Sequence, residues 1–235
     1  ELQVKDMESV EKKLQRLEKL VRSGDKDARH GCEVLEKVKA HIGNFNNART
    51  LEMSPEDRKH IDDLFLLTMK PVMYVCNVDE RSAVKGNRYV DQVKEALKGR
   101  DVEIIVIAGK IEAEIAELES VEDRLAFLQD AGLEEPGVDR MVRAAYKMLN
   151  LQTFFTVGPK EIRAWTIKKG MTAPQAAGVI HSDLERGFIR SEVIKYNDFI
   201  TYGSEHACKE AGRFFIEGKN YVVEDGDILH IRFNV

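Results

Sequence analysis

The chain has 235 residues, of which 43% are hydrophobic and 33% charged, and a formal net charge of −5. This composition is typical of a folded, helix-rich, soluble protein and excludes an intrinsically disordered chain. Every apolar run is shorter than the roughly 20 residues that span a bilayer, so we expect no membrane partner. Because no segment is strongly basic, we expect no DNA partner and only local contacts with RNA.

Cysteine usage and the first residues bear on the compartment. Cys32, Cys76 and Cys208 are odd in number and far apart, which indicates reduced thiols. Each is more typical of a small buried residue than of a nucleophile or a metal ligand. The chain begins without a signal-peptide pattern and without Met. We therefore expect a cytoplasmic protein whose native start lies elsewhere.

Residues 1–52 predict an antiparallel coiled-coil arm. Apolar residues spaced three and four apart run from Val4 to Val21, and a second apolar stripe covers 32–42. Gly24, between the two stripes, suits a left-handed helix cap. The arm can be a simple spacer or a probe that touches a large partner, and the pattern leaves both interpretations open.

Residues 53–150 predict part of a parallel α/β domain. Ser54 and Pro55 are typical of a helix start, and we expect that helix to end at about Thr68. The next predicted elements are strand 72–76, helix 89–97, strand 102–108, and helices 110–118, 121–130 and 137–149. Two doubly buried parallel strands are too few to stand alone, so we expect the second half of a larger nucleotide-binding domain.

The loop after the first strand carries the tetrapeptide Asn77-Val78-Asp79-Glu80. In nucleotide-binding sheets of the GTPase type, such a loop reads a purine: the Asn side chain faces the ring, and the acidic residue accepts hydrogen bonds from the base edge. Guanine-specific proteins have Asp in the last position, and Glu80 is one methylene longer, which disfavours guanine specificity. The alternative is a solvated strand-to-helix turn. The chain contains no G-x-x-x-x-G-K-[ST] segment to cradle phosphates.

Residues 151–235 predict a separate α+β domain. Short apolar runs typical of strands lie at 154–157, 162–167, 189–193, 214–216 and 228–233, with a helix at 173–181. Strands followed by one helix and more strands favour a small β-grasp sheet wrapped on that helix.

Several long segments resemble a known family. Val157-Gly-Pro-Lys-Glu-Ile-Arg-Ala-Trp165 and the residues that follow to Arg190 closely resemble the TGS domain of the YchF subfamily of Obg-like ATPases. The end of the chain, Val223–Val235, is similar to that family's C-terminus. Glu8–Leu20 resembles the start of its coiled-coil insertion, and Lys70–Glu80 resembles its base-recognition strand and loop. The resemblance covers essentially the whole chain.

The resemblance implies a fold and an activity. The fold would be α/β, with a partial P-loop NTPase-type parallel sheet, a coiled-coil hairpin and a C-terminal TGS (β-grasp) domain. The parent would be a ribosome-associated ATPase that uses ATP with Mg²⁺, and GTP is a further candidate. The implied base contacts are Asn77, Val78, Glu80, Ala108, Gly109 and Lys110, with Ala108 where the family usually has Ser. The phosphate loop and the Mg²⁺ ligands would precede this chain, so we expect these residues alone to be inactive and assign no catalytic or metal-binding residue.

The resemblance also implies ribosome and RNA binding. The candidate contacts are Lys160, Arg163, Trp165, Lys168, Lys169, Arg186 and Arg190. The alternative for each basic residue is an ordinary solvated surface, and Trp165 is more typical of a core. An alternative function for the whole chain is a non-catalytic ribosome- or RNA-binding module, in which the nucleotide-binding half serves as scaffold.

Overall fold

The computed structural model describes residues 1–100, 102–158 and 161–234. The chain divides into two compact units, Glu1–Cys76 with Arg88–Ile104, and Asn77–Asn87 with Ile105–Val235. None of the helices in the described part is both long and apolar enough to cross a membrane.

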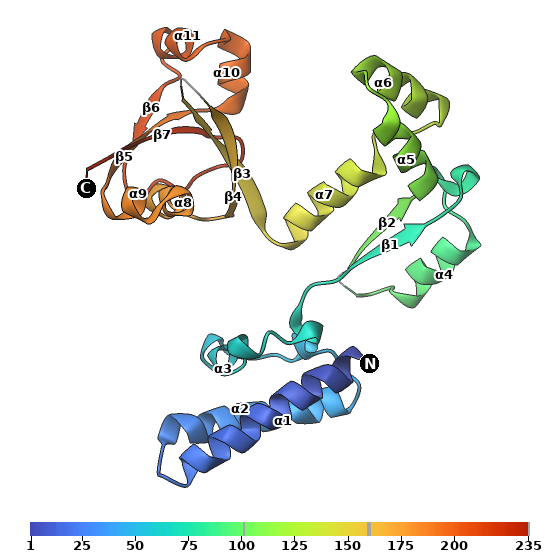
Figure 1. Cartoon of the computed structure of the whole chain (residues 1–235), viewed down its shortest axis with the longest axis vertical. Coiled ribbons are helices and arrows are strands. Elements are labelled where there is room, and N and C mark those ends of the chain that lie inside the picture. Colours follow the sequence, from blue (N-terminus) through green and yellow to red (C-terminus); the bar gives the residue numbers. More distant parts are fainter. Residues whose placement is uncertain (101, 159–160, 235) are drawn as a thin grey trace. The chain divides into compact units, whose positions relative to one another are not determined.

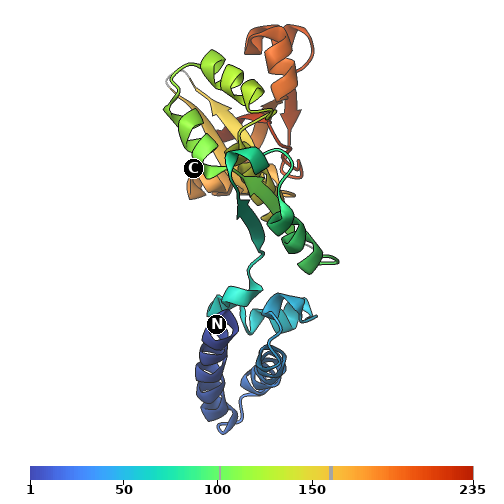
Figure 2. The same cartoon turned by 90° about the vertical axis from the view of Figure 1, so that its right-hand side faces the viewer.

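The N-terminal residues form a pair of helices. Helix α1 (Leu2–Val21) and helix α2 (Lys26–Gly43) run side by side and antiparallel (Figures 1 and 2). Gly24 takes the left-handed conformation (φ +90°) in the turn between them, and Asp25 caps α2 by accepting hydrogen bonds from two backbone amides. The two helices contribute Val10, Leu14, Val34, Leu35, Val38 and Ile42 to one buried apolar core, which Ala48, Ile61 and Leu66 from the following segment complete. The apolar spacing predicted two helices in these residues, and the structure contains both.

The predicted helix from Ser54 to Thr68 is wrong beyond its first turns. Helix α3 covers only Pro55–Lys59, with 3-10 turns at Ala48–Thr50, Asp62–Leu64 and Leu67–Met69 around it. Phe65 adopts a left-handed backbone (φ +48°), which a continuous helix excludes. The buried carboxylate of Asp6 accepts hydrogen bonds from the amides of Leu67 and Thr68, both at 2.7 Å. These tertiary bonds replace the bonds that a helix would have made.

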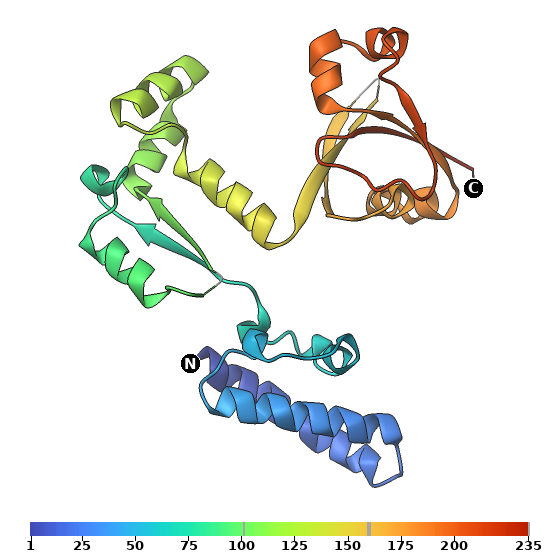
Figure 3. The same cartoon turned by 180° about the vertical axis from the view of Figure 1, so that it is seen from behind.

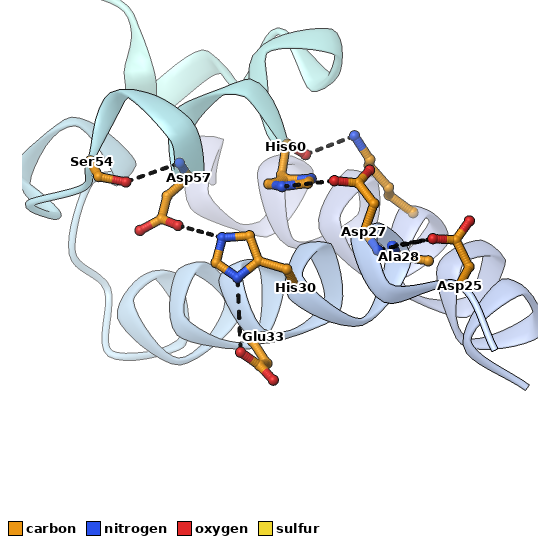
Figure 4. A network of polar contacts seen from close by, with 9 residues as sticks. Asp25, Asp27, Ala28, His30, Glu33, Ser54, Asp57 and His60 are labelled. Carbon is orange, nitrogen blue, oxygen red and sulfur yellow. Dashed lines mark hydrogen bonds and ion pairs between the residues drawn. The ribbon is translucent and has the colours of Figure 1, made fainter.

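Helix α3 is held on α2 by a polar network (Figure 4). His30 Nε2 lies 2.8 Å from a carboxylate oxygen of Asp57, and Ser54 caps α3 by accepting from the Asp57 amide. The rings of His30 and His60 meet edge to face, 5.1 Å apart. Lys13 of α1 donates to the His60 carbonyl at 2.7 Å. The network fixes α3 without an apolar core of its own.

The second part of the chain contains the predicted β-α-β order. Strand β1 (Met73–Asn77) and strand β2 (Glu103–Ile107) form a two-stranded sheet, with helix α4 (Arg88–Ala96) between them in the sequence. Helices α5 (Gly109–Glu117), α6 (Val121–Asp130) and α7 (Gly137–Met148) follow. The prediction that both strands are buried on both faces is wrong for this chain: Val75 is 45% exposed and only Ile105 is buried.

The C-terminal residues form a five-stranded sheet in the order β4-β3-β7-β5-β6 (Figure 3). The strands are β3 (Leu151–Val157), β4 (Ile162–Lys168), β5 (Phe188–Ile194), β6 (Phe215–Glu217) and β7 (Ile228–Phe233). Helices α8 (Ala173–Ile180) and α9 (Ser182–Arg186) lie on one side, and α10 (Tyr196–Tyr202) and α11 (Glu205–Glu210) on the other. The strands lie close to their predicted positions, whereas α9, α10 and α11 were not predicted.

Alternate residues of β3 supply two separate cores, because successive side chains of a strand point to opposite faces. Phe154 is fully buried in a cluster with residues of α8. Its neighbour Phe155 packs on the other face against buried Cys208 of α11 and Phe199 of α10. A further polar cluster closes the loop before β7: Lys195 donates to Tyr221 and to the fully buried Asp227, both at 2.8 Å.

Candidate functional site

The predicted base-reading loop follows directly from the end of β1. The Val78 amide donates to the Ile107 carbonyl at the end of β2 (2.8 Å), so backbone pairing of the two strands continues into the loop. The Val78 side chain packs against a small buried cluster that includes Ala83, Ala108 and Ile111. This anchoring fixes the backbone at the point where the side chains of Asn77 and Glu80 leave it.

Asn77 joins the first loop to the second. Its Oδ1 accepts a hydrogen bond from the Gly109 amide at 3.0 Å, and Gly109 is the first residue of α5. A Cβ atom added to Gly109 would lie 3.2 Å from that oxygen, closer than most real Cβ contacts. Glycine is therefore the residue that lets the two loops approach this closely.

Glu80 and Lys110 form the second link between the loops. Lys110 Nζ lies 2.5 Å from Glu80 Oε1 and 3.7 Å from a carboxylate oxygen of Glu114. The hydrogen bond with Glu80 raises the pKa of Lys110 above its usual value. Both side chains are exposed, so they meet at the surface where a ligand has access.

Asp79 has a structural role in the same loop. Its carboxylate accepts from the Ser82 amide at 2.9 Å and caps the 3-10 turn Glu80–Ser82. Hydrogen bonding with the Ser82 side chain, and next with its backbone amide, lowers the pKa of Asp79 below its ordinary value. Asp79 is thus occupied within the loop, which leaves the next residue, Glu80, to face outward.

The structure brings all six predicted base contacts together within one unit of the chain. Asn77, Glu80, Gly109 and Lys110 are exposed, whereas Ala108 is 3% exposed with its methyl group in the core. Ala108 can therefore offer a ligand only backbone groups. The sequence predicted these six positions as base contacts but did not predict the Glu80–Lys110 ion pair, because no local pattern links residues 30 positions apart.

The structure divides the predicted RNA contacts of β4 between two faces of the sheet. Arg163 and Trp165 share the face of Phe154, which α8 covers, whereas Lys168 belongs to the alternate set on the opposite face. The Arg163 guanidinium lies 4.1 Å from the Trp165 ring centre, and the ring also packs against the α8 core. Trp165 is therefore half-buried and already has a cationic partner.

The remaining candidates also differ in environment. Arg186 forms an ion pair with Asp183, and an oxygen of Glu192 lies 3.8 Å from Arg190. Lys169 is exposed. Lys160 lies outside the described residues. In the described ranges no group of three or more His, Cys, Asp or Glu side chains is arranged to hold a metal ion.

Comparisons with known proteins agree on one family. Residues 151–234 match the family model YchF-GTPase_C, described as "Protein of unknown function (DUF933)". The whole chain is 48% identical over 235 residues to the ribosome-binding ATPase YchF of Haemophilus ducreyi and covers 64% of that protein. It is 39% identical over 240 residues to Obg-like ATPase 1 of Rattus norvegicus and covers 60% of it.

A solved structure supports the same relationship. The YchF GTPase of Schizosaccharomyces pombe matches 98% of this chain and 63% of its own length, with a TM-score of 0.85 at 32% identity. The chain therefore belongs to the YchF family and has a mixed α/β fold. It spans 64% of the length of the Haemophilus ducreyi relative.

Proposed function

We propose that this chain is the base-reading and accessory part of a ribosome-associated ATPase of the YchF type, acting in the cytoplasm. In this proposal, Asn77, the Val78 backbone and Glu80 bind the adenine of ATP, with GTP as the weaker ligand. The Gly109 and Lys110 loop closes the second side of the base. The phosphate loop and the Mg²⁺ ligands belong to residues outside these 235, since no phosphate-cradling motif occurs among them.

One observation carries the proposal. Two loops 30 residues apart are joined by the Asn77–Gly109 hydrogen bond, and beside it the exposed carboxylate of Glu80 meets Lys110. A solvated turn needs no such link to a second strand end. The exposure of Val75 on β1 further supports a larger parent sheet, because parallel strands are normally covered on both faces.

Calorimetric titration of the 235-residue chain with ATP and GTP tests the proposal. We expect dissociation constants in the millimolar range and negligible hydrolysis, because the groups that hold the triphosphate are missing. Glu80→Asp, which has the shorter carboxylate suited to guanine, should shift the ratio of affinities toward GTP. Micromolar ATP binding would contradict the partial site, and an unchanged ratio would remove Glu80 from base selection.

A second candidate function is non-catalytic binding to ribosomal RNA through the C-terminal residues. The supporting observation concerns Lys168 and Lys169: both are exposed, and neither forms an ion pair with any carboxylate in the described part of the chain. Lys169 also borders a depression of about 680 Å³ that is lined by Tyr146 and Tyr196. Cations beside aromatic rings are typical of single-stranded RNA sites.

Co-sedimentation with ribosomal particles tests this second function. The chain should sediment with the particles in a salt-sensitive way, and the double change Lys168→Glu with Lys169→Glu should abolish the effect. The matched control is Lys209→Glu with Lys219→Glu, which makes the same charge change at two other exposed positions within residues 151–235. If co-sedimentation is unchanged both by added salt and by the Lys168→Glu, Lys169→Glu double change, these lysines do not bind RNA.

A further inference from the structure

The polar atoms of the two loops are only partly occupied. Asn77 Oδ1 accepts from the Gly109 amide, and Glu80 Oε1 accepts from Lys110. Within the described residues, no hydrogen bond involves Asn77 Nδ2 or Glu80 Oε2. The loops therefore leave one amide donor and one carboxylate oxygen without a partner among the described residues, whereas Asn77 Oδ1 and Glu80 Oε1 each already accept one hydrogen bond.

The two purines make different demands on a carboxylate. Guanine presents two adjacent donors, N1–H and the 2-amino group, and both are satisfied only by a carboxylate with two available oxygens. Adenine presents one amino group beside N1, which is an acceptor, so it needs a single carboxylate oxygen. A carboxylate with one oxygen already held by an ammonium group keeps its other oxygen wholly available for adenine, whereas guanine would have to share the first oxygen with the ammonium group, which weakens one of its two hydrogen bonds.

We propose that Lys110 is a specificity-determining residue, which holds one oxygen of Glu80 and thereby selects adenine over guanine. The inference rests on the proposed function, because it requires that the loop bind a purine. Lys110 would act through Glu80 and need not touch the base itself. The longer Glu side chain suits this role, since it reaches across to the neighbouring loop.

A simpler role for Lys110 would be to stabilise the first turn of α5 through Glu114, which lies 3.7 Å away on the same helix. Exposed pairs of this kind contribute little to stability. The two roles predict different outcomes, because only the selection role depends on Glu80. A double-mutant cycle between Lys110 and Glu80 separates them.

The experiment titrates the 235-residue chain with AMP and GMP and follows the amide signals of residues 77–80 and 108–110 by NMR. Lys110→Met should raise GMP affinity relative to AMP by about tenfold, which corresponds to one charge-assisted hydrogen bond gained by guanine. Lys110→Arg, which keeps a cation, should leave the ratio close to that of the original chain. Lys98→Met is the control, because Lys98 is about as exposed as Lys110 and pairs with a glutamate outside the two loops.

Each outcome decides a definite point. If Lys110→Met shifts the ratio and the shift disappears when Glu80 is also changed to Gln, the inference stands. If AMP binds at these residues but the ratio is unchanged in Lys110→Met, or if the shift persists with Glu80→Gln, selection by Lys110 is overturned and base reading survives. If neither nucleotide perturbs these signals, the proposed base-reading function fails and the inference falls with it.

Discussion

Asp6 should be among the residues on which the N-terminal unit depends most for stability. Its carboxylate is 2% exposed and accepts from the Leu67 amide, the Thr68 amide and the Thr68 hydroxyl, at 2.6–2.7 Å. Thr68 is 1% exposed, whereas Leu67 is 41% exposed. Asp6→Ala therefore leaves two buried donors of Thr68 without an acceptor, while water can replace the bond to Leu67. At roughly 1–3 kcal/mol for each orphaned donor, the expected loss is about 3 kcal/mol.

Urea denaturation provides the assay. A loss of about 3 kcal/mol at a typical slope lowers the midpoint of the helical circular-dichroism transition by roughly 1–3 M urea. Trp165 is the only tryptophan and lies in the other unit, so its fluorescence transition should not move. Asp6→Asn should cost less than Asp6→Ala, since both Thr68 donors bond to one carboxylate oxygen and the Asn amide oxygen can take its place, which leaves the new NH2 group facing only the Leu67 amide.

Glu8→Ala is the matched control, because Glu8 lies on the same helix and forms an exposed pair with Lys5. Its cost should stay below about 0.5 kcal/mol. If the midpoint of Asp6→Ala fell within the scatter of this control, the buried carboxylate would not be what holds the segment before β1. An equal shift of the Trp165 transition would also refute the local assignment.

Three other sites in the chain allow similar tests. Asn77→Ala removes the acceptor of the Gly109 amide, so hydrogen exchange at that amide should accelerate by about tenfold, and unchanged exchange by NMR would contradict the link. Burial and a hydrogen bond to Asp227 raise the pKa of Tyr221 to about 12. The neutral phenol therefore stabilises the folded state fully below the unfolded-state pKa near 10, and this stabilisation is lost as pH rises toward 12. Tyr221→Phe should weaken the fall of the unfolding midpoint at alkaline pH, and an identical fall in the variant would count against this reasoning. Burial raises the pKa of the Cys208 thiol, so mass spectrometry should show it modified by a thiol reagent last of the three, and early labelling would be inconsistent with a closed core.

The sequence predicted elements well where periodicity is strong and poorly where tertiary bonds decide. The stripe from Val4 to Val21 gave α1 within two residues at each end, because packing and propensity agree there. The segment after Lys59 carries helix-forming residues, yet the distant Asp6 carboxylate competes for its amides. Helices α10 and α11 are too short for a periodic signal, and their boundary at Gly203 is a local left-handed turn.

The candidate site was predictable in position but not in detail. The family resemblance implied that both loops contact one base, and the ends of neighbouring strands at one edge of a parallel sheet give a physical reason for the two loops to meet. The pairing of Glu80 with Lys110 depends on side-chain reach across that edge, which sequence spacing does not report. The placement of Arg163 and Lys168 on opposite faces of β4 could have been predicted from the sequence. Side chains of a strand alternate between its two faces, and these two residues are an odd number of positions apart.

The basic residues of β4 have a second physical explanation. β4 is the first strand in the order of its sheet, so one of its edges is unpaired by the other strands of that sheet. Charged side chains on an edge strand discourage pairing with another chain, and Arg163 and Lys168 can serve that purpose without touching RNA. Lys168→Glu keeps a charged side chain on the edge strand, so protection against pairing remains. The new negative charge, however, repels a phosphate backbone. Loss of ribosome binding in the Lys168→Glu and Lys169→Glu variant, without aggregation, would therefore reflect RNA contact and not edge protection.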